Sequence, residues 1–209
     1  METSLGVIMA LRFTQSLAEI GKKAEKELLK QVNARLVQIR PNVRRRFKGV
    51  LTTALLSSPE IESLRGGDLK GEFGLDTDPS GELVAAIMAT LDVKVKTATP
   101  KRKGGLSVIL QPSDYSNLLS QPWASQAIDG GRIPWLEWLL TLGDSIIISD
   151  YGVEFGAFPS SRSGIALMST QTAPYKVNGQ YSGTRENNFI TRAIRRIRPE
   201  LDRIFKGAL

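Results

Sequence analysis

The stretch from Ile133 to Phe158 holds the densest apolar sequence in the chain and constrains the fold more than any other. Pro134 suits the first turn of a helix, because its missing N–H would have no partner there in any case. The apolar side chains that follow lie nearly all round a short helix, so that helix must be buried. These side chains are Trp135, Leu136, Trp138, Leu139, Leu140 and Leu142. We therefore expect this helix to serve packing rather than chemistry.

Two strands are predicted in the second half of the same stretch. Gly143 ends the helix, and the β-branched run at residues 146–148 predicts a strand buried on both faces. After a turn at residues 149–152, apolar residues alternate through positions 153–157, as they do in a strand. The whole stretch 133–158 is thus predicted to form the core.

The chain contains no histidine and no cysteine. Without cysteine, disulfides, Cys-ligated zinc, iron–sulfur clusters and thiol nucleophiles are excluded. Without histidine, the commonest metal ligand and the commonest general base are missing, and a Ser–His–Asp triad is impossible. The glycine patterns of nucleotide-binding loops and of the nucleophile elbow are also absent. The sequence therefore predicts a protein that is not an enzyme, with no catalytic residue, no cofactor site and no metal site.

One loop has a partial likeness to a calcium-binding loop. Asp76–Gly81 places side-chain oxygens at the first, third and fifth positions and glycine at the sixth. The twelfth position, which should be a bidentate glutamate, is Ile87. We therefore expect a plain turn here.

The net charge of +7 is concentrated in the two ends of the chain. Residues 1–50 hold eleven Lys or Arg and four Glu, and residues 185–206 hold seven Lys or Arg and three acids. A basic surface can bind nucleic acid, bind an acidic partner, or only keep the protein soluble, and the composition leaves all three open. The run Arg44, Arg45 and Arg46 is a candidate contact with phosphates or an acidic neighbour.

Residues 1–57 are predicted to form an extended basic helical arm. From Leu17 to Ala54 the apolar positions recur every three or four residues, which places them in one stripe on a long helix. Pro41 interrupts this pattern, so we expect a kink there or two helices that meet near Arg40.

Residues 182–209 are predicted to form a C-terminal helix. Ser182–Thr184 is the expected cap, and the apolar residues from Phe189 to Ile204 share one face. Pro199 is expected to kink or divide this helix.

Between these arms, residues 58–181 are predicted to form a body of strands and short helices. Ser58 with Pro59 marks a helix start, and residues 114–131 predict one or two short helices around Trp123. Residues 93–97 and 106–110 predict a β-hairpin. Its tip cannot pack inward and must project into solvent or a partner, because it carries Lys101, Arg102 and Lys103. The predicted fold is a single α+β domain, with both long helices packed on a mostly antiparallel β-sheet.

Six motifs of the chain carry a resemblance to known proteins: SLRGGDLKGEFGL at 63–75, SDYSNLL at 113–119, IPWLEWLLTLGDSIIISDY at 133–151, SRSGIALM at 161–168, PYKV at 174–177 and YSGTRENNFITRAI at 181–194. They resemble those of a group of tailed-bacteriophage virion proteins. Relatives often carry tryptophan and arginine where this chain has Tyr175 and Lys176. More loosely, the chain is similar to small tail-completion proteins that join a long N-terminal helix to a β-sheet.

This resemblance implies a structural protein of the neck or tail, in head–tail joining, tail completion or tail termination. It implies a sixfold or twelvefold ring of identical subunits, held by head-to-tail contacts and bound to neighbouring neck or tail proteins. The implied location is the virion, and the host cytoplasm during assembly. No apolar run approaches the ~20 residues of a membrane span, so no membrane partner is expected.

The candidate partner contacts are cations: Lys101, Arg102, Lys103, Arg162, Arg185, Arg44, Arg45 and Arg46. Two other functions stay open at this point. The basic helices could make the chain a DNA-binding protein, or bring a ring subunit into passing contact with genomic DNA. The chain could also be an assembly chaperone that is absent from the finished particle.

Overall fold

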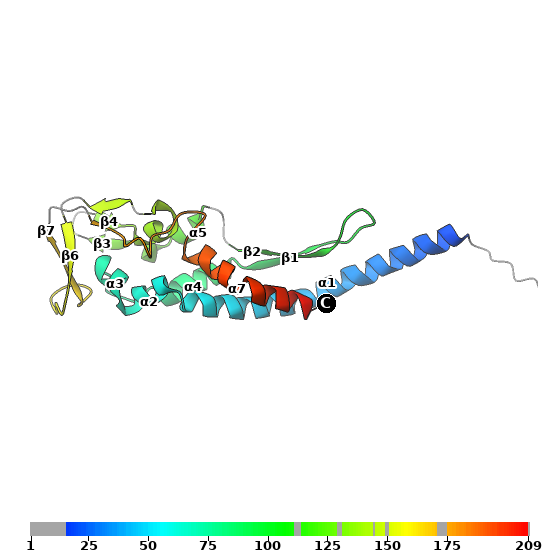
Figure 1. Cartoon of the computed structure of the whole chain (residues 1–209), viewed down its shortest axis with the longest axis horizontal. Coiled ribbons are helices and arrows are strands. Elements are labelled where there is room, and N and C mark those ends of the chain that lie inside the picture. The colour runs from blue at the N-terminus through cyan, green and yellow to red at the C-terminus, as the bar shows by residue number, and fades with distance from the viewer. Residues whose placement is uncertain are drawn as a thin grey trace, which may run out of the picture.

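The computed structural model has an elongated shape, with a body of short elements at one end (Figure 1). Helix α1 and a β-hairpin extend from this body in the same direction (Figure 1). The fold is α+β, as predicted: the long N-terminal helix packs with the C-terminal helix, and short helices separate short antiparallel ladders. The structure describes residues 16–110, 114–128, 131–143, 145–148, 151–170 and 175–208.

Helix α1 (Leu17–Leu56) forms the long axis of the molecule. Its first turn is closed by a capping box, in which Ser16 N donates to Glu19 Oε2 at 2.9 Å and Glu19 N donates to Ser16 Oγ at 3.3 Å. The helix continues through Pro41, so the alternative of two helices meeting near Arg40 is wrong. Figure 1 shows α1 changing direction along its length, as an interior proline causes by removing one backbone hydrogen bond.

Three short helices follow: α2 (Pro59–Gly66), α3 (Asp68–Glu72) and α4 (Ser80–Ala89). The predicted start of α2 is confirmed, because Ser58 Oγ accepts a hydrogen bond from Ile61 N at 3.4 Å. The apolar faces of all three helices contribute to the main core.

The predicted β-hairpin is confirmed as β1 (Asp92–Lys96) paired antiparallel with β2 (Gly105–Ile109). Its apolar side packs on the side of α1 that carries Leu36 and Ile39. Two hydrogen bonds tie the end of the hairpin to α1: Asn33 Nδ2 donates to Ala98 O at 3.0 Å, and Ala98 N donates to Asn33 Oδ1 at 2.7 Å.

The remaining strands form further two-stranded ladders instead of the single sheet that was predicted. Helix α5 (Ser116–Leu119) and a 3₁₀ turn, η1 (Pro122–Ala124), lie around Trp123 as expected. The other pairs, all antiparallel, are β3 (Gln126–Ile128) with β4 (Gly131–Ile133), β5 (Ile146–Ile148) with β8 (Tyr175–Lys176), and β6 (Tyr151–Phe155) with β7 (Ala166–Thr170). These strands are two to five residues long.

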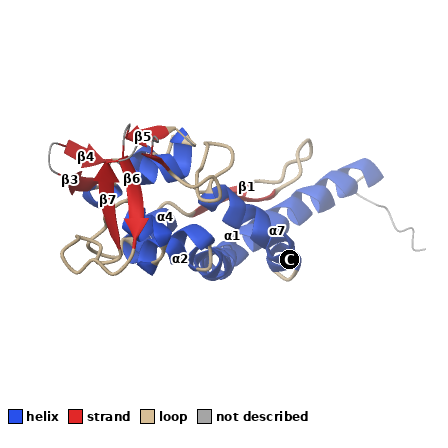
Figure 2. Ribbon diagram, turned by 60° about the vertical axis from the view of Figure 1, so that its left-hand side comes forward, coloured by secondary structure: helices blue, strands red, loops and turns tan. Residues whose placement is uncertain are grey.

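The first half of the 133–158 stretch is buried, and the described part of its second half is not. Helix α6 (Trp135–Glu137) continues into a π-helical turn, η2 (Trp138–Leu142), and the indole of Trp138 stacks on Phe73 at 6.3 Å between ring centroids. Leu142 is exposed, and Phe155 in β6 is 50% exposed. The prediction of a core through Phe158 is therefore wrong for β6, which pairs with β7 at the far end of the body (Figure 2). The side chains at 146–148 lie outside the described residues.

Helix α7 (Phe189–Lys206) is capped by Asn188, so the predicted cap at Ser182–Thr184 is wrong. Asn188 Oδ1 accepts from Thr191 N at 3.1 Å, and Asn188 N donates to Thr191 Oγ1 at 2.9 Å. The serine–glycine segment instead passes directly over the π-helical turn, where Gly183 N donates to Trp138 O at 3.1 Å. There a Cβ on Gly183 would lie 1.9 Å from Leu139 O, which only glycine avoids.

The Asn188 side chain also joins three parts of the chain. It is fully buried, and its Nδ2 donates to Tyr115 Oη at 2.8 Å, to Thr184 O at 2.9 Å and to Leu140 O at 3.3 Å. These bonds link the start of α7 to the π-helical turn and to the N-terminus of α5.

Helix α7 then lies along α1 (Figures 1 and 2). Its apolar face is buried as predicted, with Ile197 and Ile204 against α1 and its neighbours, and Pro199 does not divide it. Arg192 pairs with the carboxylate of Glu60, which is 3% exposed, and so fastens α7 to α2.

We expect Asn188→Ala to lower the free energy of unfolding by about 2–4 kcal/mol. The loss combines a helix cap, about 1 kcal/mol, with buried acceptors left unpaired, about 1–3 kcal/mol. Urea denaturation followed by circular dichroism measures the change. The control is Asn187→Ala at the adjacent, exposed residue, where a change within about 0.5 kcal/mol is expected. Equal losses in the two variants would contradict the role given to Asn188.

Candidate functional site

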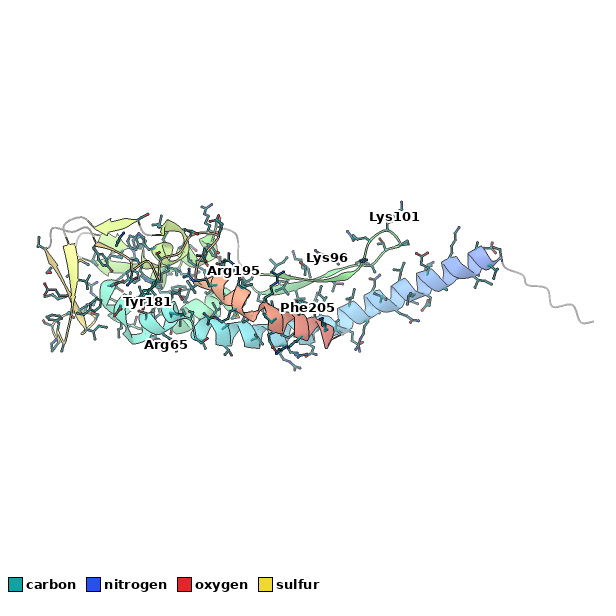
Figure 3. All side chains as sticks on the ribbon, viewed as in Figure 1. Arg65, Lys96, Lys101, Tyr181, Arg195 and Phe205 are labelled. Carbon is teal, nitrogen blue, oxygen red and sulfur yellow. The ribbon has the colours of Figure 1, made fainter. Side chains whose placement is uncertain are left out.

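The predicted partner-contact cations are all exposed, but the structure does not bring them into one site. Lys101 to Lys103 lie at the far end of the hairpin, where Figure 3 labels Lys101. Arg44 to Arg46 lie on α1. Arg162 lies in the loop between β6 and β7, and Arg185 lies just before α7. Contacts through these residues would engage neighbours on several sides of the molecule.

The turn that carries the hairpin-tip cations is held by backbone hydrogen bonds. Thr99 N donates to Arg102 O at 2.9 Å, and Arg102 N donates to Thr99 O at 3.0 Å, which closes the turn. Gly104 packs so tightly on Ala98 that a Cβ would lie 2.8 Å from it. Among the described residues, the ion pairs use Lys30, Arg192 and Arg203, and none uses the tip. The three tip cations are therefore not neutralised by an acidic side chain of the described chain.

The arginines on α1 are less free than the sequence suggests. Arg44 donates from Nε and Nη2 to Leu91 O at 3.2 and 3.1 Å, and so holds the end of the α4 segment against α1. Arg45 Nη2 donates to Asn42 Oδ1 at 3.1 Å. No sequence pattern predicts the Arg44 contact, because its partner is a backbone carbonyl 47 residues away.

Arg162 and Arg185 also have local roles. Arg162 Nη1 donates to Ala127 O at 2.6 Å and connects the β6–β7 loop to β3. Hydrogen bonds from Ser116 lower the pKa of Asp114, and the positive charge of Arg185 adds to the effect. Both arginines remain exposed, so each can still meet a partner.

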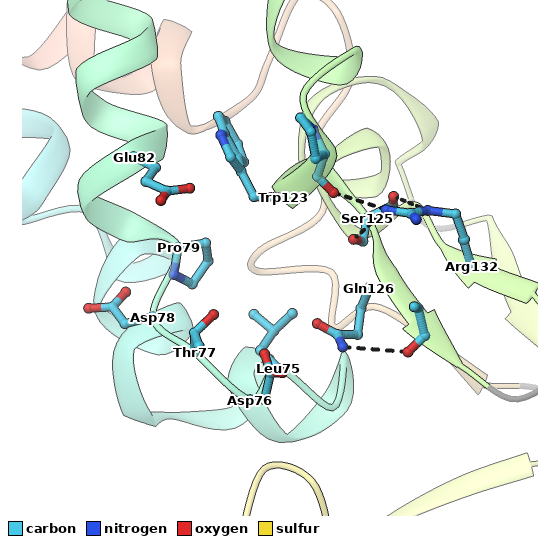
Figure 4. A pocket seen from close by; sticks show the side chains of 12 residues that line it. Leu75, Asp76, Thr77, Asp78, Pro79, Glu82, Trp123, Ser125, Gln126 and Arg132 are labelled. Carbon is cyan, nitrogen blue, oxygen red and sulfur yellow. Dashed lines mark hydrogen bonds between the residues drawn. The ribbon is translucent and has the colours of Figure 1, made fainter.

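A pocket of about 450 Å³ lies between the 75–82 segment and the β3–β4 region (Figure 4). Asp76, Asp78 and Glu82 line one side of it, and Trp123 and Arg132 line the other. Asp78 Oδ1 accepts a hydrogen bond from Ser80 N at 2.9 Å and so shapes the start of α4. The described residues contain no group of three or more His, Cys, Asp or Glu side chains that could hold a metal.

A second pocket, of about 590 Å³, lies where α3 meets β6 and β7. Phe73, Val153 and Met168 give it an apolar lining, with Arg162 among its polar residues. Gly71 lies at this contact, and a Cβ there would lie 2.8 Å from Phe155 Cε1.

Glu72, which also lines this pocket, is the one described carboxyl whose pKa is raised toward neutrality. Glu72 is only 8% exposed, and its Oε2 has no hydrogen-bond partner among the described residues. Burial raises the pKa of Glu72 to about 7; the Tyr175 hydroxyl opposes this shift, and the charge of Asp68 adds to it. Burial also raises the pKa of Tyr175, and the charge of Glu72 reinforces that effect.

Comparison of the chain with protein-family models, curated proteins and solved structures finds no significant match in any of the three. The resemblance to phage virion proteins therefore rests on the sequence motifs. The structure gives some residues of those motifs a packing role: Gly71 lies against β6, Gly183 against the π-helical turn, and Asn188 at the start of α7. Over the described residues, no helix combines the length and the apolar character needed to span a membrane.

We expect Glu72 to make stability fall as pH rises from about 4.5 to about 7. The unfolded chain releases this proton near the ordinary pKa of 4.5, whereas the folded chain keeps it until about 7. The free energy of unfolding of the wild type therefore falls by about 1–3 kcal/mol across this window relative to that of Glu72→Gln, and it does not fall further at higher pH. Urea denaturation of both proteins at several pH values measures the difference. The matched control is Glu62→Gln, at an exposed carboxyl on α2; a wild-type minus Glu72→Gln difference that does not vary with pH would contradict the prediction.

Proposed function

We propose that this chain is a structural subunit of a tailed-phage neck or tail, acting in head–tail joining, tail completion or tail termination. It forms a homo-oligomeric ring through non-catalytic protein–protein contacts. The observation that carries the proposal is the shape of the molecule: α1 and the hairpin reach well beyond the body (Figure 1). The phage-like motifs of the body support the same assignment.

The geometry suits contacts with neighbours on different sides. The cationic hairpin tip lies at one end of the hairpin, and Arg162 lies in the body beside β3. A ring of identical subunits needs two different patches that meet head to tail, and surfaces at separate places on one subunit meet that requirement. In this ring the tip cations pair with acidic side chains of a neighbouring subunit or ring.

DNA binding is a second candidate, supported by the cation run on α1. Arg40 to Lys48 contains five Lys or Arg and no acid. A DNA-binding protein should lose affinity steeply as salt rises, because each phosphate contact releases counterions. Two of these arginines, Arg44 and Arg45, already donate to groups within the chain, which weakens this candidate.

Quantitative mass spectrometry of purified particles of the phage that encodes the chain tests the proposal. We expect a fixed copy number near six or twelve relative to the portal protein, since a ring has a defined number of subunits. Absence from the particle would overturn the proposal and favour the assembly chaperone or the DNA-binding protein.

We expect the triple variant Lys101→Glu, Arg102→Glu and Lys103→Glu to block assembly without unfolding the subunit. The tip is exposed and makes no ion pair in the described chain, so its charge reversal should cost little stability. Complementation of a phage that lacks the gene measures assembly, and circular dichroism measures folding. A control with the same charge change, Lys48→Glu with Lys94→Glu and Lys96→Glu, alters exposed cations away from the tip. Normal assembly by the tip variant would contradict a contact there.

A further inference from the structure

The apolar stripe of α1 extends beyond the part of the helix that the rest of the chain covers. From Leu36 onward its members are buried against the hairpin, α7 and the body. Before Leu36 the same stripe is open to solvent: Leu17 is 88% exposed and Leu28 is 62% exposed. The exposed members are Leu17, Ile20, Ala24, Leu28 and Val32, called here the N-terminal stripe.

The part of α1 that the hairpin and the C-terminal segment cover ends near Asn33 and Leu36. The two hydrogen bonds between Asn33 and Ala98 join α1 to the hairpin near this place, and Ile204 and Ala208 of the C-terminal segment pack beside Leu36. Figures 1 and 3 show the first part of α1 continuing past both the hairpin and the C-terminus. Within the described residues, nothing covers the N-terminal stripe.

The uncovered part of α1, before Leu36, would gain stability from a partner. Isolated helices of about 12–15 residues are marginal in water, and most helical stability in proteins comes from packing of the apolar face. Gly21 lowers the intrinsic helix propensity further, by about 1 kcal/mol relative to alanine. The N-terminal stripe is thus a surface that gains by being buried.

The charges beside the stripe indicate which partner fits. Lys22, Lys23, Lys26 and Lys30 are interleaved with Glu19, Glu25 and Glu27, so the segment is nearly neutral. By helical spacing, Lys23 and Glu27 lie one turn apart on one flank of the stripe, and Glu25 lies on the other flank. A surface with both signs close together fits another surface of the same kind, as flanking charges do between paired helices. A strongly acidic partner would instead fit flanks that carry only positive charge.

The spacing of the stripe supports helix-to-helix packing. Leu17, Leu28 and Ile39 recur at eleven residues, as do Val32, Val43 and Ala54. An eleven-residue repeat corresponds to 3.67 residues per turn, which keeps an apolar stripe facing a neighbouring helix when the two helices form a right-handed supercoil. The members of this repeat beyond Leu36 are already packed within the chain, so the exposed members extend the same packing pattern outward.

We infer that the N-terminal stripe binds the same stripe on a second copy of this chain. In this arrangement α1 runs along the ring axis, so rotation about that axis leaves equivalent helices of neighbouring subunits parallel. One edge of the stripe then meets the opposite edge of the stripe on the next copy, which keeps the contact head to tail. This inference rests on the proposed function and assigns one of its subunit contacts: the apolar stripe holds neighbouring copies together along α1.

Light scattering coupled to size-exclusion chromatography of the full chain tests the inference. Leu28→Glu should weaken self-association at least tenfold, because it places a charge in the buried stripe. Val37→Glu is the matched control: Val37 is 60% exposed, close to Leu28 in exposure, and by helical spacing lies on the opposite side of α1. It should associate like the wild type. A monomeric wild type at tens of micromolar, or equal association of both variants, would overturn the inference.

Disulfide trapping tests the parallel arrangement directly, since the chain has no native cysteine. Leu28→Cys should form a covalent dimer under mild oxidation, because equivalent positions face each other in parallel helices. Lys26→Cys, two residues away on the opposite side of the helix, should remain monomeric on denaturing gels. Trapping of Lys26→Cys as readily as Leu28→Cys would contradict the arrangement.

These results separate the inference from the proposed function. If Leu28→Glu dissociates the protein but the chain is absent from phage particles, the stripe contact stands and the phage-ring function fails. If the chain is present at a ring-like copy number and Leu28→Glu still associates, the function stands and the stripe contact fails.

Discussion

The Asn188 side chain holds together parts of the chain that share no strand ladder or helix face. It caps α7, and its amide donates to the π-helical turn and to the Tyr115 hydroxyl at the start of α5. Because the ladders of the body are short, they fix few of these relative positions. A buried, fully bonded polar group gives a unique arrangement where apolar packing alone tolerates alternatives. The ion pair between Arg192 and the buried Glu60 adds a second fixed point on the same helix.

The elongated shape follows from how α1 is covered. Its apolar stripe spans nearly the whole helix, but the hairpin, α7 and the body cover only the part from Leu36 onward. Since α1 is a continuous helix, the uncovered part must project (Figure 1). One secondary-structure element thus supplies both the axis of the folded domain and a surface outside it.

Sequence reasoning predicted what periodicity and local chemistry determine. The long helix, the Ser58 cap, the β1–β2 hairpin, the buried tryptophan helix and the apolar face of α7 all follow from side-chain spacing. Features that depend on distant contacts were missed: the bonds from Asn188 to Tyr115 and Leu140 O, the exposure of Phe155, and the bond between Arg44 and Leu91 O. Asn188 followed by Thr191 was a readable capping signal, but Ser182–Thr184 offered a competing one. The buried bonds of Asn188 and the close approach of Gly183 to Leu139 O distinguish them in the structure.

The two projecting surfaces differ in what they can contribute to the proposed ring. The hairpin tip carries charge on an exposed turn, and exposed charges mainly affect the rate and specificity of association. The N-terminal stripe carries apolar area, whose burial supplies most of the affinity in protein association. Because the hairpin is tied to α1 through Asn33, the two surfaces keep a fixed relative position on each subunit. A neighbour oriented by the tip would therefore meet the stripe in a single register, which a ring of identical subunits requires.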